Sequence, residues 1–168
     1  MTSFFIALRS AVYATSFVFL WGWIALGVRR SFGEWIELPP MFEFIGVTCM
    51  TTGGAIVLWC LTQFLLVGRG TPAPFDAPTT LVTTGPYRYV RNPMYLGASL
   101  VLLGFGFYNL SATIACFTIA FLLLAHVFVL LYEEPTLERQ FGSRFQAYKI
   151  LVNRWLPKKL RQRDQAAS

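Results

Sequence analysis

The chain reads GPYRYVRNPMYLG from Gly85 to Gly97, directly before a long apolar run. Gly followed by Pro signals a turn, because Gly tolerates positive φ and Pro fixes φ near the value that a turn needs. Asn92 and Pro93 are a typical helix start, since Asn can cap free N–H groups and Pro at the first helical position loses no hydrogen bond. The stretch therefore predicts a turn and then a helix that begins at Pro93.

The same stretch is rich in aromatic and basic side chains for a segment next to hydrocarbon. A helix N-terminus presents unpaired N–H groups and a partial positive charge, so together with Arg88 and Arg91 it suits a carboxylate or a phosphate. The alternative interpretation is a membrane-interface belt, in which Tyr anchors at the lipid headgroups and Arg meets anionic lipid.

The composition indicates a single membrane domain. Of the 168 residues, 55% are hydrophobic and only 13% are charged, whereas soluble domains carry roughly 25% charged residues. The net charge of +6 does not indicate nucleic-acid binding, because the basic residues lie at the edges of apolar runs. This position is typical of basic residues that contact anionic lipid headgroups. The three cysteines, Cys49, Cys60 and Cys116, lack a metal-ligand spacing, and no metal site is predicted.

Four apolar segments predict an all-α fold, an integral membrane bundle of four transmembrane helices. They cover residues 4–28, 42–67, 93–108 and 112–132. A spanning helix needs about 20 residues, and the third segment reaches roughly 24 Å against a hydrocarbon core of about 30 Å. Only Asn109, Leu110 and Ser111 join the last two segments, so these helices must form a tight antiparallel hairpin.

The distribution of basic residues predicts the orientation of this bundle. With four spans, all of the 14 Lys and Arg residues except Arg29 and Arg30 lie on one side. The positive-inside rule makes that side cytoplasmic. Residues 68–92 and the segment after the fourth span then face the cytoplasm together.

A second polar cluster begins inside the fourth span. His126 is an ionisable residue within a span and is therefore a functional candidate, although a neighbouring helix could simply satisfy it. Two helical turns later come Glu133 and Glu134, and this spacing places His126 and Glu133 on one face. The two carboxylates need a cationic partner or water, and Arg88, Arg91 and Arg154 lie on the correct side. The alternative interpretation is a solvated helix end.

The segment after this cluster has the pattern of an amphipathic helix. Its apolar residues recur at spacings of three or four: Leu137, Phe141, Phe145, Tyr148 and Val152. Basic residues stand between them, which predicts a C-terminal amphipathic cytoplasmic helix lying on the membrane surface. Such a helix could fold back over the 85–97 segment.

The motifs together resemble a known family. The 85–97 stretch, followed by EEPTLERQFGSRFQAY over residues 133–148 and VNRWLP over residues 152–157, is similar to the isoprenylcysteine carboxyl methyltransferases. That broad family also takes in bacterial phospholipid-methyltransferase-like proteins. The resemblance implies a multi-pass enzyme of the bacterial inner membrane that transfers a methyl group from S-adenosyl-L-methionine. The acceptor would be a lipophilic molecule reached from the bilayer, and the site would face the cytoplasm.

The resemblance also implies site residues. The cofactor-binding positions carried over by motif are Thr79, Thr80, Leu81, Val82, Tyr87, Asn92, Pro93, Met94, Tyr95 and Glu133. Arg91 and Arg154 are candidates to hold a carboxylate or phosphate of the acceptor. If the acceptor must lose a proton, His126 is the first candidate for the base and Glu134 is the second.

Two positions depart from the family pattern. Asn92 replaces a His, so the residue keeps its hydrogen-bonding capacity but cannot titrate. Val129 stands where prenylcysteine methyltransferases carry an Arg that meets the substrate carboxylate. We therefore expect an acceptor other than a prenylcysteine.

The apolar segments and the motifs divide the single domain, residues 1–168, into four predicted parts. These are a two-helix hairpin (1–67), a cytoplasmic cofactor loop (68–92), a second hairpin with an interfacial helix (93–157) and a basic tail (158–168). Two alternative functions stay open. One is an NADPH-dependent enzyme like the sterol reductases, although the chain lacks a dinucleotide Gly-rich fingerprint. The other is a non-catalytic membrane partner protein that retains the fold.

Overall fold

The computed structural model describes residues 2–68, 71 and 78–158, and none of these residues forms a β-strand. The helical elements in chain order are α1 (Thr2–Phe32), α2 (Met41–Gln63), the π-helical η1 (Phe64–Gly68), the 3-10 turn η2 (Gly85–Arg88), α3 (Pro93–Tyr108), α4 (Ala112–Phe128), the π-helical η3 (Val129–Glu133), α5 (Glu134–Phe141) and α6 (Ser143–Leu151). The prediction of an all-α fold is confirmed for this part of the chain.

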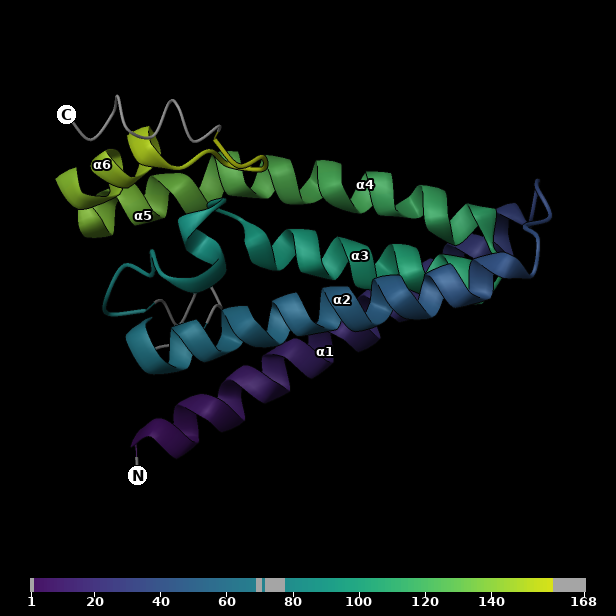
Figure 1. The fold of residues 1–168 in the computed structure, drawn as a ribbon, viewed down its shortest axis with the longest axis horizontal. Helices are drawn as coiled ribbons and strands as arrows, with labels where there is room; N and C mark the ends of the chain where they lie inside the picture. Colours follow the sequence, from purple (N-terminus) through teal and green to yellow (C-terminus); the bar gives the residue numbers. More distant parts are fainter. Residues whose placement is uncertain (1, 69–70, 72–77, 159–168) are drawn as a thin grey trace.

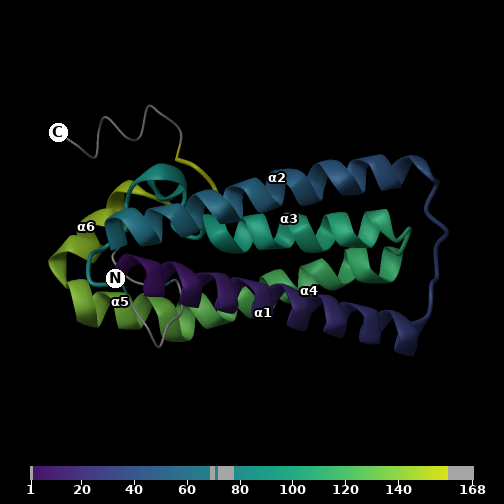
Figure 2. The same cartoon turned by 90° about the horizontal axis from the view of Figure 1, so that it is seen from below.

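The long helices α1, α2, α3 and α4 are each antiparallel to the helix before them in the chain (Figure 1). The α1–α2 connection and the α3–α4 turn lie at one end of the molecule, and the N-terminus, η2, α5 and α6 lie at the other (Figure 2). An isolated antiparallel bridge between Glu37 and Ser111 joins the two connections at the first end. The two polar motifs predicted from the sequence therefore occupy the same end of the bundle.

Three helical stretches of the described chain are long and apolar enough to cross a membrane. They are Phe5–Phe32, Met41–Gly68 and Ala112–Phe141, and α3 is a shorter apolar helix of 16 residues. These stretches agree with a multi-pass membrane protein. The prediction of four spans is confirmed only in part, because α3 is too short to meet the same criterion.

The contact between α2 and α3 is the most extensive among the described elements, and glycines make it possible. A Cβ atom at Gly53 would lie 2.5 Å from the carbonyl oxygen of Gly97, and one at Gly104 would lie 2.6 Å from that of Gly46. Small residues let helix backbones approach closely in membranes, where apolar side chains gain little by leaving lipid. Gly53 thus allows α2 and α3 to pack closely against each other.

The fourth helix continues beyond its predicted end. α4, η3 and α5 follow one another from Ala112 to Phe141, and Gly142 then stops the helix with φ 51° and ψ −126°. That conformation strains any residue with a Cβ atom. The single amphipathic helix expected over residues 137–152 is therefore not confirmed, because Gly142 divides the segment into α5 and α6. The predicted apolar positions of both helices pack around buried Phe145.

A polar cluster fastens the α1–α2 connection to the start of α4. Glu34 forms an ion pair of 2.8 Å with Arg29 and accepts a hydrogen bond of 3.4 Å from the backbone N–H of Thr113. The indole of Trp35 donates to the Thr113 hydroxyl at 2.7 Å. Although burial raises the pKa of Glu34, hydrogen bonds from Ser111 and Thr113 and the charge of Arg29 hold that pKa below its ordinary value.

Parts of two predicted segments lie outside the described residues. These parts are residues 69–70 and 72–77 of the expected cytoplasmic loop, and residues 159–168 of the expected basic tail. Four basic residues used for the orientation fall there, namely Arg69, Lys159, Arg161 and Arg163. The division of the chain into four parts stays a prediction.

Candidate active site

A narrow cavity of about 80 Å³ lies where the ends of α2 and α4 meet the start of α3 and the two short helices. Its lining comes from segments far apart in the sequence: Phe64; Pro78, Leu81 and Val82; Tyr87, Arg91, Asn92 and Tyr95; Phe128, Tyr132, Glu133 and Glu134; Thr136, Leu137 and Gln140; and Phe145 and Tyr148. Both π-helical turns border this cavity. Such turns recur at functional sites in other proteins.

The first turn of α3 is joined to the end of α4 through Tyr95 and Glu133. The Tyr95 hydroxyl donates a hydrogen bond of 3.0 Å to Glu133 Oε2. Among the described residues, no other side chain donates to the Glu133 carboxylate. A carboxylate on a cavity wall with unused acceptor positions is suited to bind a cationic group.

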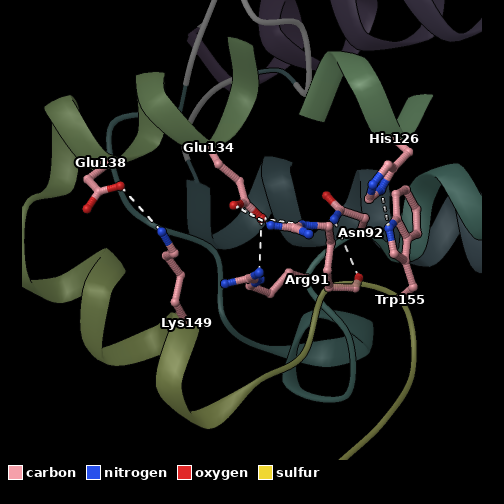
Figure 3. A network of polar contacts seen from close by, with 8 residues as sticks. Arg91, Asn92, His126, Glu134, Glu138, Lys149 and Trp155 are labelled. Carbon is pink, nitrogen blue, oxygen red and sulfur yellow. Dashed lines mark hydrogen bonds and ion pairs between the residues drawn. The ribbon is translucent and has the colours of Figure 1, made fainter. Parts of the chain in front are cut away.

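The next residue, Glu134, is buried between two arginines (Figure 3). Arg154 binds it in a bidentate manner, with Nε 2.8 Å from Oε1 and Nη2 2.9 Å from Oε2. Arg91 Nη2 lies 3.0 Å from the same Oε1. One carboxylate thus serves two guanidinium groups, and the cluster keeps one positive charge in excess.

Arg91 is the member of this cluster with a free hydrogen-bond donor. Its side chain is 10% exposed, and its buried Nε has no hydrogen-bond partner among the described residues. Burial lowers the pKa of Arg91, and the charge of Glu134 opposes that shift. A free donor, an excess positive charge and the nearby N-terminus of α3 together favour an anionic group in the cavity.

The segment that follows α6 is bound along the start of α3. The backbone N–H of Arg91 donates to the carbonyl of Asn153 at 2.9 Å, and that of Asn92 donates to the carbonyl of Arg154 at 3.2 Å. The side-chain amide of Asn92 reaches the same Arg154 carbonyl at 3.4 Å. Asn92, where the family carries a His, therefore holds the C-terminal segment in place without needing to titrate.

Tyr148 connects α6 to the 3-10 turn η2. Its hydroxyl donates a hydrogen bond of 2.6 Å to the carbonyl of Tyr87. Burial raises the pKa of Tyr148, so the hydroxyl stays a neutral donor at physiological pH. Burial likewise raises the pKa of Tyr87, whose ring meets Phe64 edge-on at 5.6 Å. The sequence suggested that the C-terminal helix could fold over the motif, and Phe145 and Tyr148 of α6 do line the cavity.

His126 lies away from the cavity wall and is paired with Trp155. The indole Nε1 of Trp155 donates to His126 Nδ1 at 2.9 Å. A π-helical turn holds more residues than an α-helical turn, so η3 rotates Glu133 away from the face that the seven-residue spacing predicted. His126 and Glu133 are instead related through Tyr95, whose ring lies edge-on to Trp155 at 6.4 Å between centroids.

The structure brings most of the predicted site residues together. Eight of them line the cavity: Leu81, Val82, Tyr87, Arg91, Asn92, Tyr95, Glu133 and Glu134. Arg154 contacts the lining residue Glu134, and Met94 packs behind the wall with Cys60, Val82 and Tyr87.

Besides Arg154 and Met94, four predicted site residues are not on the cavity wall. Pro93 is buried at the start of α3, and His126 is paired with Trp155. Thr79 and Thr80 lie on an exposed turn, where their backbone N–H groups bind the carbonyl of Gly68 at 3.0 Å and 3.4 Å. These assignments stay predictions.

Sequence reasoning missed two groups of residues. One is an aromatic set on the cavity wall, Phe64, Phe128 and Tyr132, which apolar pattern alone could not separate from lipid-facing positions. The other is Trp155, to which the sequence assigned no role. Its position directly after Arg154, in a segment with a family-like motif, was the available signal.

The fold and the cavity define a helical membrane protein with a charged, partly enclosed site at one end of its bundle. The model of the phospholipid methyltransferase family matches residues 42–144, and the chain belongs to this family. The resemblance found in the sequence is thereby confirmed at the level of this broad methyltransferase family. No curated protein and no solved structure matches the chain.

Proposed function

We propose that this protein is a membrane methyltransferase that uses S-adenosylmethionine and acts on a lipophilic acceptor reached from the bilayer. Membership of the phospholipid methyltransferase family supports the reaction class. The position of the basic residues Arg88, Arg91, Arg139, Arg144 and Lys149 at the same end as the cavity supports a site that faces the cytoplasm.

The observation that carries the proposal is the pairing of opposite charges on one cavity wall. Glu133 offers a carboxylate whose one described partner is the Tyr95 hydroxyl. Arg91 offers an N–H donor within a cluster of net positive charge. The methionine part of the cofactor carries an ammonium and a carboxylate, which match Glu133 and Arg91 respectively. The residues present therefore fit the group.

The size of the cavity sets a condition on this fit. Pockets that enclose ligands of cofactor size hold roughly 300–1,000 Å³, whereas this cavity holds about 80 Å³. Binding therefore requires side chains at the rim to move. Phe128 and Tyr132 are suited to this, because they are 38% and 44% exposed and stack on each other at 5.3 Å.

The same aromatic residues support access for the acceptor from the bilayer. Phe64 belongs to η1 at the end of α2, whereas Phe128 and Tyr132 belong to the end of the α4 helix. All three line the cavity. An apolar acceptor that moves between these helix ends would reach the wall that carries Glu133 without crossing water.

The chemistry requires alignment and exclusion of water more than a strong base. Bound S-adenosylmethionine supplies a methyl group on a sulfonium, and its transfer leaves S-adenosylhomocysteine while a protonated acceptor releases its proton to water. Both oxygens of Glu134 are occupied by Arg91 and Arg154, which favours a positioning role for Glu134 over its predicted role as a base.

Calorimetry on the detergent-purified protein tests the cofactor. We expect micromolar binding of S-adenosylmethionine and S-adenosylhomocysteine, and a loss of at least about tenfold in Glu133→Gln. Glu138→Gln is the matched control, because Glu138 lies on α5 and pairs only with Gln146 and Lys149 among the described residues. Binding of NADPH instead would favour the reductase alternative, and binding of neither ligand by folded protein would favour the non-catalytic partner.

The acceptor is tested with labelled cofactor and lipid nanodiscs. The family's name points to phospholipids, so phosphatidylethanolamine is the first probe, and phosphatidylglycerol, which has no amine, is its control. Lipophilic carboxylates, hydroxyls and thiols complete the screen. Label in phosphatidylethanolamine alone would assign the amine class.

A further inference from the structure

His126 has one of its two ring nitrogens occupied by the C-terminal segment (Figure 3). Trp155 Nε1 donates to His126 Nδ1 at 2.9 Å, and the two rings lie 6.0 Å apart between centroids. Indole is a donor only, so Nδ1 must be the acceptor of this bond. A neutral imidazole has a single proton, which therefore resides on Nε2.

The position of Trp155 is fixed by neighbours on both sides. Directly before it, Arg154 binds Glu134 through its side chain and Asn92 through its carbonyl. On the other side, the ring of Tyr95 meets Trp155 edge-on, and the Tyr95 hydroxyl holds Glu133. Arg154, Glu134, Tyr95 and Glu133 are thus engaged in contacts of their own.

We propose that Trp155 is a positioning residue that holds His126 in the Nε2–H form, so that His126 acts as a hydrogen-bond donor and not as a general base. A base at Nε2 would have to carry its existing proton on Nδ1, where it would point at the indole N–H. The donor role implies an acceptor molecule with an oxygen that receives the hydrogen bond, such as a lipid phosphate, ester or carboxylate. This last step rests on the proposed methyltransferase function.

The hydrogen bond between Trp155 and His126 can be tested without measuring enzymatic activity. His126 is the one histidine of the sequence, so nitrogen-15 labelling of histidine in protein freed of its affinity tag gives a single, unambiguous imidazole. When the imidazole is neutral, we expect a bare, hydrogen-bonded Nδ1 and a protonated Nε2. Trp155→Phe keeps an aromatic ring but removes the indole N–H donor. It should therefore move the Nδ1 resonance of His126 downfield.

The control for that spectrum is Trp23→Phe, because Trp23 lies on α1 and is 72% exposed. This variant should leave the imidazole resonances in place. A proton on Nδ1 in the parent protein, or an Nδ1 resonance that Trp155→Phe leaves unchanged, would overturn the pairing. The spectrum tests the Trp155–His126 pairing even if the protein transfers no methyl group.

The role of His126 is tested by two amide replacements in the methyl-transfer assay on phosphatidylethanolamine nanodiscs. The amide of Gln reaches the position of Nε2 and can still donate, whereas that of Asn lies near Nδ1. We expect His126→Gln to retain about tenfold more activity than His126→Asn. The two variants should differ mainly in their KM for the lipid.

Equal loss of activity in His126→Gln and His126→Asn would refute the donor role of His126. If cofactor binds but no lipid is methylated, or if no cofactor binds, the proposed function fails at that step. The spectrum then still decides whether Trp155 fixes the tautomer of His126.

Discussion

The hydroxyl of Tyr95 lies 3.0 Å from Oε2 of Glu133 and joins the first turn of α3 to the π-helical end of α4. Tyr95 lies in the short helix that follows the predicted cofactor loop, and Glu133 lies 38 residues further along the chain. Their contact therefore fixes the distance between the two motifs that the sequence singled out.

Tyr95→Phe is expected to weaken the binding of S-adenosylhomocysteine by about tenfold, because Glu133 loses the donor that orients its carboxylate. Isothermal titration calorimetry in detergent measures the change. Tyr89→Phe is the control, since Tyr89 directly follows η2 and its side chain is 49% exposed. Unchanged or tighter binding in Tyr95→Phe would show that this contact does not organise the site.

Gly53→Ala is expected to destabilise the α2–α3 contact, because the added Cβ would lie 2.5 Å from the carbonyl oxygen of Gly97. Gly54→Ala is a control one residue away, where an added Cβ meets no described atom within 4 Å. Ala is favoured over Gly in helices by about 1 kcal/mol, so Gly54→Ala should be neutral or slightly stabilising. Thermal unfolding in detergent compares the two, and equal melting temperatures would contradict the close packing.

Glu134→Ala is expected to cost about 3–5 kcal/mol of stability, because it leaves Arg91 and Arg154 facing each other without their shared carboxylate. Glu138→Ala removes a partly exposed ion pair with Lys149 and should cost much less stability. Denaturant unfolding from mixed micelles measures both changes. Similar costs for the two variants would mean that the arginine cluster contributes no more than a surface pair.

The pKa of Glu34 predicts how pH acts on the opposite end of the bundle. Its folded-state pKa is lowered, so its contribution is present above the unfolded pKa and is lost as pH falls through the folded one. We expect Glu34→Gln to lower the melting temperature at pH 7, and the difference from the parent to shrink as the pH falls below the ordinary pKa range of a glutamate. A difference that persists at low pH would assign the effect to packing, and Glu37→Gln serves as the control.

Local signals predicted α3 with the bounds that the structure has. Pro93 starts a helix because it needs no donor, and Asn109, Leu110 and Ser111 leave no room for anything but a turn. The long apolar stretches were equally readable, because each residue contributes to hydropathy independently of the fold. The end of α4 was not, since whether a helix continues through a π turn depends on what packs against it.

The site divides in the same way. The motifs named Tyr95, Glu133 and Arg91, and the structure places all three on one cavity wall. Whether Glu134 is solvated or buried could not be read from its neighbours in sequence, because its two arginines come from segments on either side of α3 and α4. The contact between the indole of Trp155 and His126 could not be predicted either, because it joins two segments that are far apart in the sequence.

The sequence by itself determined that this is a helical membrane protein, where its apolar helices begin, and which motifs meet at one end. These properties follow from hydropathy, from the fixed rise of a helix and from the backbone limits of Pro and Gly, all of which act locally. The tertiary structure decided that Gly53 and not Gly54 faces α3, that Glu133 and Glu134 have different partners, and that His126 is held by Trp155. Those outcomes depend on rotations of helices about their axes, which are set by packing between segments that no short stretch of sequence contains.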